Sequence, residues 1–142
     1  MKFIDKQLLD EVSRQAQKSD RLRMNYNFHQ SLDDRCHRFL NAVEPGTEVP
    51  IHRYLKTSET AICIEGCLDW IIYKELPTVV DGGPVHNGET ATDETQFTEA
   101  ARIRICPREG KYGIQVPLGA WHSIEVYEPS TIFEAKDGKY GE

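Results

Sequence analysis

Residues 46–66, GTEVPIHRYLKTSETAICIEG, decide the fold of this 142-residue chain. β-branched and apolar residues on both sides of 55–58 predict two short strands joined by a turn. His52 and Tyr54 lie two positions apart, so their side chains leave the same face of an extended strand. We expect a hairpin around the turn to bring Glu59 beside them.

A second stretch, PLGAWH at 117–122, carries another histidine. Its proline and glycine predict a turn that delivers His122 to the start of a further strand. Two imidazoles and a carboxylate are the donors of facial-triad metal sites, which leave coordination positions open. His52, Glu59 and His122 are therefore candidate metal ligands.

Together the two stretches resemble the two motifs of the cupin superfamily. The first motif, G-x5-H-x-H-x4-E-x6-G, matches at Gly46, His52, Glu59 and Gly66, with Tyr54 in place of the second histidine. The second motif, P-x-G-x2-H, matches at Pro117, Gly119 and His122. The resemblance implies a mainly β fold, an antiparallel β-barrel of the double-stranded β-helix or jelly-roll type, with an N-terminal helix.

More narrowly, the chain is similar to the WbuC-type cupin-fold metalloproteins. The similarity covers the N-terminal helix, a strand over 23–29, both cupin motifs and the ending at 133–140, and it is weakest over 75–100. It implies a metal-binding barrel, whose gene in some cases lies among genes with surface-polysaccharide functions. It also implies a homodimer, because cupin barrels commonly pair.

The expected cofactor is one divalent or ferric metal ion, and the donor set does not distinguish iron, manganese, zinc and nickel. Tyr54 allows two interpretations. It is either a fourth ligand as a phenolate, which ferric iron would favour, or a neighbouring hydrogen-bonding group beside a three-ligand zinc or manganese ion. Alternatively, His52, Glu59 and His122 form a cluster of polar residues in a barrel that binds no metal, since one fold hosts many functions.

The segment 21–29 alternates strictly between polar and apolar residues and therefore predicts a two-faced strand. A solvated strand face would explain the polar side. The resemblance instead implies that this side faces the cavity, where amides, imidazole and guanidinium groups suit hydroxyl-rich or carboxylate ligands. The candidate substrate-binding residues are Arg23, Asn25, Asn27, His29 and Arg38.

The rest of the chain predicts one domain over 1–142, with a helix and strand extension over 1–44 and a barrel core over 45–142. Apolar spacing predicts an amphipathic helix over 5–18, capped by Asp5, and a helix or turn over 33–43. Short β-type runs lie at 47–54, 60–64, 68–73, 101–106, 112–116, 122–127 and 131–136. The segment 75–99 predicts a long exposed loop.

Net charge of −6 and a pI near 5.4 disfavour binding to nucleic acid or to anionic membranes. No apolar run is long enough to span a bilayer and no secretory signal is evident, so we expect a cytoplasmic protein. In that compartment the four cysteines are expected to be small core residues.

Two functions fit these observations. The first is a metal-dependent enzyme acting on a sugar-like or carboxylate molecule, for which isomerase, epimerase and dioxygenase chemistries are all compatible. The second is a non-catalytic cupin module that binds such a molecule with structural metal or none. No residue is assigned a catalytic role.

Overall fold

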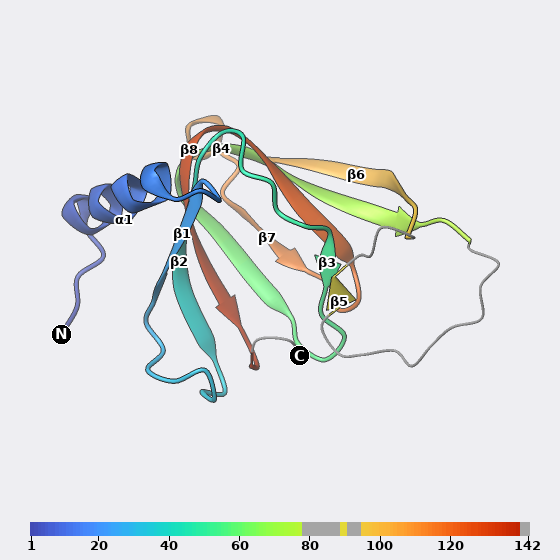
Figure 1. Cartoon of the computed structure of the whole chain (residues 1–142), viewed down its shortest axis with the longest axis horizontal. Coiled ribbons are helices and arrows are strands. Elements are labelled where there is room, and N and C mark those ends of the chain that lie inside the picture. Colours follow the sequence, from blue (N-terminus) through green and yellow to red (C-terminus); the bar gives the residue numbers. More distant parts are fainter. Residues whose placement is uncertain (78–88, 91–94, 140–142) are drawn as a thin grey trace.

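The computed structural model describes residues 1–77, 89–90 and 95–139 (Figure 1). The elements along these residues are α1 (Lys6–Lys18), β1 (Arg23–Asn27), β2 (His37–Val43), β3 (His52–Arg53), β4 (Glu59–Glu75), β5 (Glu89–Thr90), β6 (Phe97–Ile105), the short 3-10 helix η1 (Pro107–Glu109), β7 (Gly113–Val116) and β8 (Trp121–Lys136). The eight strands form one sheet in which every pairing is antiparallel. The predicted antiparallel β fold with an N-terminal helix is confirmed.

Two long strands, β4 and β8, form the frame of the sheet and run side by side across the molecule (Figure 1). Each joins two runs that the sequence predicts as separate strands. The β4–β8 register shifts repeatedly between Cys63 and Leu68, and such bulges bend a sheet and increase its twist. Within the described residues the curved sheet does not close completely, because β1 pairs with β2 alone and β6 with β4 alone.

Gly66 lies at the bend of β4, with a φ of 109°. A Cβ atom at this position would lie 2.5 Å from the Cα of Ser130 and 2.6 Å from the carbonyl oxygen of Pro129. The two long strands therefore approach each other at this point more closely than any side chain permits.

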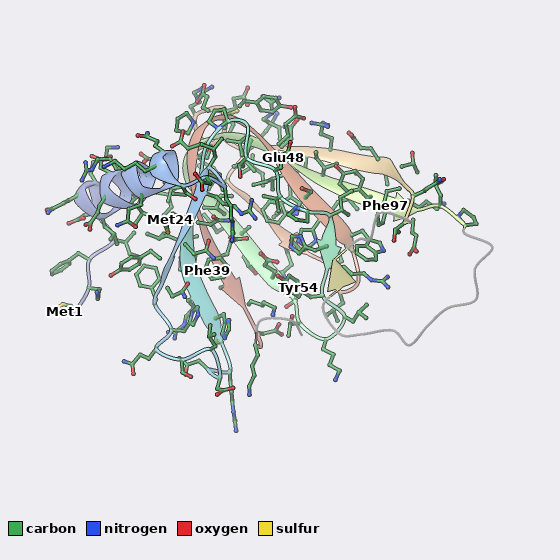
Figure 2. The ribbon with its side chains drawn as sticks, in the orientation of Figure 1. Met1, Met24, Phe39, Glu48, Tyr54 and Phe97 are labelled. Carbon is green, nitrogen blue, oxygen red and sulfur yellow. The ribbon has the colours of Figure 1, made fainter. Side chains whose placement is uncertain are left out.

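Helix α1 begins where the sequence predicts it. The side chain of Asp5 accepts a hydrogen bond from the Leu8 backbone N–H at 3.0 Å. Val12 and Ala16 are buried against the sheet, where they meet Ala42 of β2 and Met24 of β1. Figure 2 shows Met24 beside α1. The helix thus covers the outer face of β1 and β2. In the described part of the chain, no helix has the length and apolar character that crossing a bilayer requires.

The prediction of a helix or turn over 33–43 is wrong, because 37–43 forms the strand β2. Both faces of β2 are covered. Phe39 and Asn41 line an interior cavity, while Leu40 and Ala42 lie on the opposite face, where Ala42 meets α1. A strand covered on both sides lacks a clean alternation of polar and apolar residues, so its period is hard to recognise.

The predicted hairpin between the two halves of the first motif is also wrong. β3 pairs with β5 and β8 rather than with β4, and His52 lies opposite His122 of β8. β8 therefore holds both motifs together. It carries His122 opposite His52 of β3, and it also pairs with β4, which carries Glu59.

Two smaller predictions also change. Cys36 is exposed, whereas the other three cysteines are buried as predicted. Of the loop predicted over 75–99, residues 78–88 and 91–94 lie outside the described residues. Around them, β5 and the start of β6 are strands.

Candidate metal centre and its cavity

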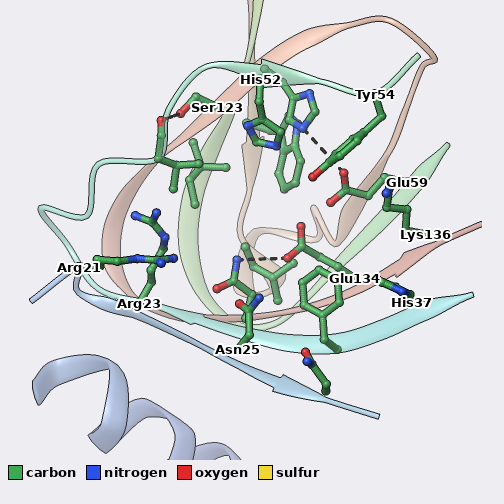
Figure 3. A pocket seen from close by; sticks show the side chains of 18 of the residues that line it. Arg21, Arg23, Asn25, His37, His52, Tyr54, Glu59, Ser123, Glu134 and Lys136 are labelled. Atoms are coloured by element: carbon green, nitrogen blue, oxygen red, sulfur yellow. Dashed lines mark hydrogen bonds and ion pairs between the residues drawn. The ribbon is translucent and has the colours of Figure 1, made fainter. Parts of the chain in front are cut away.

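A cavity of about 200 Å³ lies inside the curved sheet (Figure 3). β3, β4 and β8 contribute two histidines and a glutamate to one wall, and a tyrosine just after β3 joins them. β1 and β2 contribute polar side chains to the facing wall. The residues of the first wall are His52, Tyr54, Glu59 and His122.

The two imidazoles of this wall are held in the same way. Their ring centroids are 4.3 Å apart. Nδ1 of His52 lies 2.8 Å from the Pro50 carbonyl oxygen, and Nδ1 of His122 lies 2.8 Å from the Ala120 carbonyl oxygen. Because each carbonyl accepts a hydrogen bond from Nδ1–H, each Nε2 keeps its lone pair for another partner. This arrangement is typical of metal-binding histidines.

Glu59 completes the donor set. One carboxylate oxygen, Oε2, lies 3.8 Å from Nε2 of His122. Both atoms are buried, and neither has a hydrogen-bond partner in the described structure. Buried polar atoms are almost always paired, so the space between these two facing acceptors is a candidate position for a cation. Two imidazole nitrogens and a carboxylate fit a first-row transition metal ion.

The turn between 117 and 120 connects the second motif to the first by a backbone hydrogen bond. Gly119 adopts a φ of 77°, and its N–H donates to the Tyr54 carbonyl oxygen at 2.8 Å. The Ala120 N–H donates to the Pro117 carbonyl oxygen at 3.2 Å, so the predicted turn is confirmed. Both motifs are therefore joined by backbone hydrogen bonds independently of any ion.

Burial lowers the pKa of His122 to about 4, and the neighbouring His52 adds to this effect. Trp70 contributes to the burial because its indole stacks on the His122 ring with centroids 5.6 Å apart. His122 is therefore neutral near pH 7, which is the form that binds metal ions.

This lowered pKa predicts how the stability of the metal-free protein depends on pH. Between the unfolded value of 6.5 and the folded value of about 4, only the unfolded chain protonates His122. His122 alone should therefore lower the free energy of unfolding by about 3 kcal/mol as the pH drops through this window. Urea titrations in chelator should show this contribution as the difference in pH dependence between the wild type and His122→Gln. Equal falls in the two proteins would contradict the prediction.

Tyr54 lies at the edge of the donor set. Its ring centroid is 5.5 Å from that of His52, and its phenol extends toward Glu59 (Figure 3). The ammonium group of Lys136 lies 4.2 Å from the centre of the same ring. Tyr54 thus stands where the first motif would place its second histidine, beside His52 and Glu59.

The polar side of β1 and its flanks faces the same cavity. Arg23, Asn25, Asn27 and His29 all line it, as does Arg21. Arg38 does not, because it leaves the opposite face of β2, where it is exposed and its Nε donates to the Cys36 carbonyl oxygen at 3.4 Å. The prediction that Arg38 lies at the site is therefore wrong, because the strand β2 turns its side chain to the other face.

Several cavity residues are absent from the sequence-based prediction. His37, which lies in the segment predicted as a helix or turn, is only 3% exposed and stacks on His29 with centroids 4.1 Å apart. Deeper in the cavity, Asn41 Nδ2 donates to Glu134 Oε2 at 3.2 Å. Burial and the nearby Glu59 carboxylate raise the pKa of Glu134 well above its ordinary value. Spacing by two residues within β2 and within the end of β8 would have found these residues only after both segments were recognised as strands.

Solved structures share this architecture. The hydroquinone 1,2-dioxygenase PnpCD, in complex with Cd²⁺ and 4-hydroxybenzonitrile, has a TM-score of 0.60 and 13% identity over 96% of this chain and 79% of that chain. A sugar phosphate isomerase of the cupin superfamily from Silicibacter pomeroyi has a TM-score of 0.52 and 15% identity over 81% of this chain and 59% of that chain. The capsular polysaccharide assembling protein CapF from Staphylococcus aureus has a TM-score of 0.51 and 17% identity over 84% of this chain and 29% of that chain.

The chain therefore spans less than two thirds of the length of the isomerase and of CapF. At such low identities the likeness shows the fold alone, and that fold is the cupin jelly roll, as the sequence predicts. Among curated protein sequences none matches this chain. Residues 4–82, more than half of the sequence, match a family described as a domain of unknown function, DUF6016, and the chain belongs to that family.

Proposed function

We propose that the cavity binds one divalent or ferric metal ion and that the protein binds or transforms a small polar molecule beside it. Nε2 of His52, Nε2 of His122 and the carboxylate of Glu59 would hold the ion. The observation that supports this most directly is the pair of buried, unpartnered acceptors on Glu59 and His122, 3.8 Å apart.

When bound, such an ion supplies a Lewis acid for a carbonyl or hydroxyl oxygen. The chain's own residues would bind and orient the small molecule. The amides of Asn25, Asn27 and Asn41 offer hydrogen bonds to hydroxyl groups, and Oδ1 of Asn41 is a buried acceptor with no partner among the described residues. Arg23 lines the cavity with its Nη1 donating to the Glu48 carbonyl oxygen at 2.9 Å, so its position is fixed.

These groups suit a sugar-like or carboxylate molecule. Two structural neighbours point in the same direction, since one is named a sugar phosphate isomerase and the other a capsular polysaccharide assembling protein. The narrower similarity to WbuC-type cupins, with its link to surface polysaccharides, belongs to the same proposal. The enzyme classes compatible with it are isomerase, epimerase and dioxygenase.

A second candidate function is a non-catalytic module that binds the same class of molecule. The observation that favours it is Tyr54, which replaces an imidazole in the first motif and thereby reduces the number of nitrogen donors. The two functions differ in whether any candidate sugar or acid is converted to product by the metal-loaded protein.

Elemental analysis of purified protein tests the metal centre. After growth in metal-replete medium and exhaustive dialysis, Glu59→Gln should retain one metal equivalent per chain fewer than the wild type, because an amide oxygen carries no charge. Asn25→Ala is the matched control, since Asn25 lines the facing wall and offers no ligand. Equal metal content in all three proteins would reject the proposed centre.

The role of Tyr54 can be read from the same samples. If the ion is ferric and Tyr54 binds it as a phenolate, the protein should absorb visible light and Tyr54→Phe should lose this absorption. If Tyr54 acts only through a hydrogen bond, Tyr54→Phe should keep the metal content and the spectrum of the wild type.

A further inference from the structure

Outside the cavity, two buried cysteines face each other on neighbouring strands. β4 and β6 pair with Leu68 opposite Ile105, and one step along this register places Cys67 opposite Cys106. Cys67 is 2% exposed and Cys106 is fully buried. Their sulfur atoms and a carboxylate oxygen of Glu109 all lie within 4.8 Å of one another.

The chain brings Glu109 to the thiols through a tight turn. The short helix η1 follows Cys106 directly, and the Glu109 N–H donates to the Cys106 carbonyl oxygen at 2.9 Å. Gly110 ends the turn with a φ of 76°. The exposed carboxylate therefore lies on the solvent side of two buried sulfurs, which leaves room for water as a further ligand.

We propose that Cys67, Cys106 and Glu109 form a second metal site, specific for a thiophilic divalent cation such as Zn²⁺ or Cd²⁺. Zinc–sulfur bonds of about 2.3 Å in a tetrahedron place ligand atoms about 3.8 Å apart, so the three groups need only small movements. Binding releases the two thiol protons to solvent, and water fills the fourth position.

The surrounding charges fit a dithiolate site. Nη1 of Arg104 lies 3.6 Å from Sγ of Cys67, while its Nε donates to Asp69 at 2.7 Å. Two thiolates and a carboxylate carry three negative charges, a divalent cation leaves one, and the Arg104 guanidinium lies where it offsets that charge. Hydrogen bonds from outer groups to ligand atoms are a regular feature of metal sites.

This site is separate from the cavity. None of its three residues lines the cavity, and its sulfur donors differ from the nitrogen and oxygen donors there. Soft thiolates select zinc and cadmium, whereas the cavity donors also suit iron and manganese. The two sites can therefore be distinguished by spectroscopy.

Cadmium titration of the reduced protein tests the proposal. The wild type should develop the ultraviolet charge-transfer absorption of a cadmium–thiolate bond, and the absorption should reach saturation. Cys67→Ser and Cys106→Ser should lose it. Glu109→Ala, which changes an exposed residue and should fold normally, should weaken cadmium binding by roughly 10- to 100-fold or more, since loss of an outer-shell residue alone costs that much.

Two controls isolate the site. Cys36→Ser removes an exposed thiol elsewhere and should leave the titration unchanged. His122→Ala should keep the full thiolate absorption, so failure of the cavity proposal and failure of this one are distinguishable. Absence of the absorption in the wild type, unchanged binding in Glu109→Ala, or a Cys67–Cys106 disulfide that persists in reductant would overturn the proposal.

Discussion

Replacing His122 with alanine is expected to weaken Mn²⁺ binding by roughly 100-fold or more, because loss of outer-shell partners alone costs 10- to 100-fold. His122 is the most deeply buried donor of the candidate centre, 2% exposed, and its Nε2 has no other partner in the described structure. Isothermal titration calorimetry measures the change. Mn²⁺ is the suitable probe because thiolates, including those of the second site, bind it weakly.

Ser123→Ala is the control for this experiment. Ser123 is buried beside His122 and lines the same cavity, but its hydroxyl donates to the Val49 carbonyl oxygen at 2.6 Å and offers the ion nothing. His52→Ala should weaken binding as His122→Ala does, and since His52 is only half-buried its loss disturbs packing less. Wild-type affinity in both histidine variants would show that these imidazoles hold no ion.

Replacing Gly66 with alanine is expected to lower the free energy of unfolding by about 2–5 kcal/mol. Its positive φ costs an alanine about 1–2 kcal/mol. Contact of the added Cβ with the backbone of Pro129 and Ser130, at 2.6 and 2.5 Å, costs about 1–3 kcal/mol more because neither long strand can move aside. Urea unfolding followed by circular dichroism measures the loss.

Gly110→Ala is the matched control for Gly66→Ala. Gly110 also has a positive φ, 76°, but nothing lies within 4 Å of an added Cβ. Gly110→Ala should lower the free energy of unfolding by about 1–2 kcal/mol, from the backbone conformation alone. If the two variants lose equal stability, the close approach of β4 and β8 at Gly66 adds no steric cost to an alanine there.

The parts of the fold that local rules determine could be predicted from the sequence. The cap at Asp5 and the apolar spacing of α1 are local signals, and the alternation over 21–29 indicated which side chains of β1 share a face. That the polar face meets the cavity was implied only by the family resemblance. The continuity of β4 through Gly66 could not be predicted, because a glycine that ends a strand and one that bends it have the same local pattern.

The cavity could be predicted only in part for the same reason. The motif spacing indicated His52, Glu59 and His122, and the structure brings their side chains to one wall. His37, Asn41 and Glu134 depend on β2 and β8 pairing side by side across many residues of sequence, which no local pattern states. The approach of Cys67 to Cys106 likewise comes from the β4–β6 register.

A crystal structure of protein grown in metal-replete medium, with anomalous scattering recorded for the bound element, tests the central claim most directly. The claim predicts one anomalous peak about 2.0–2.2 Å from Nε2 of His52, Nε2 of His122 and a carboxylate oxygen of Glu59. A map without a peak at these three atoms, whatever it shows at Cys67 and Cys106, would contradict it.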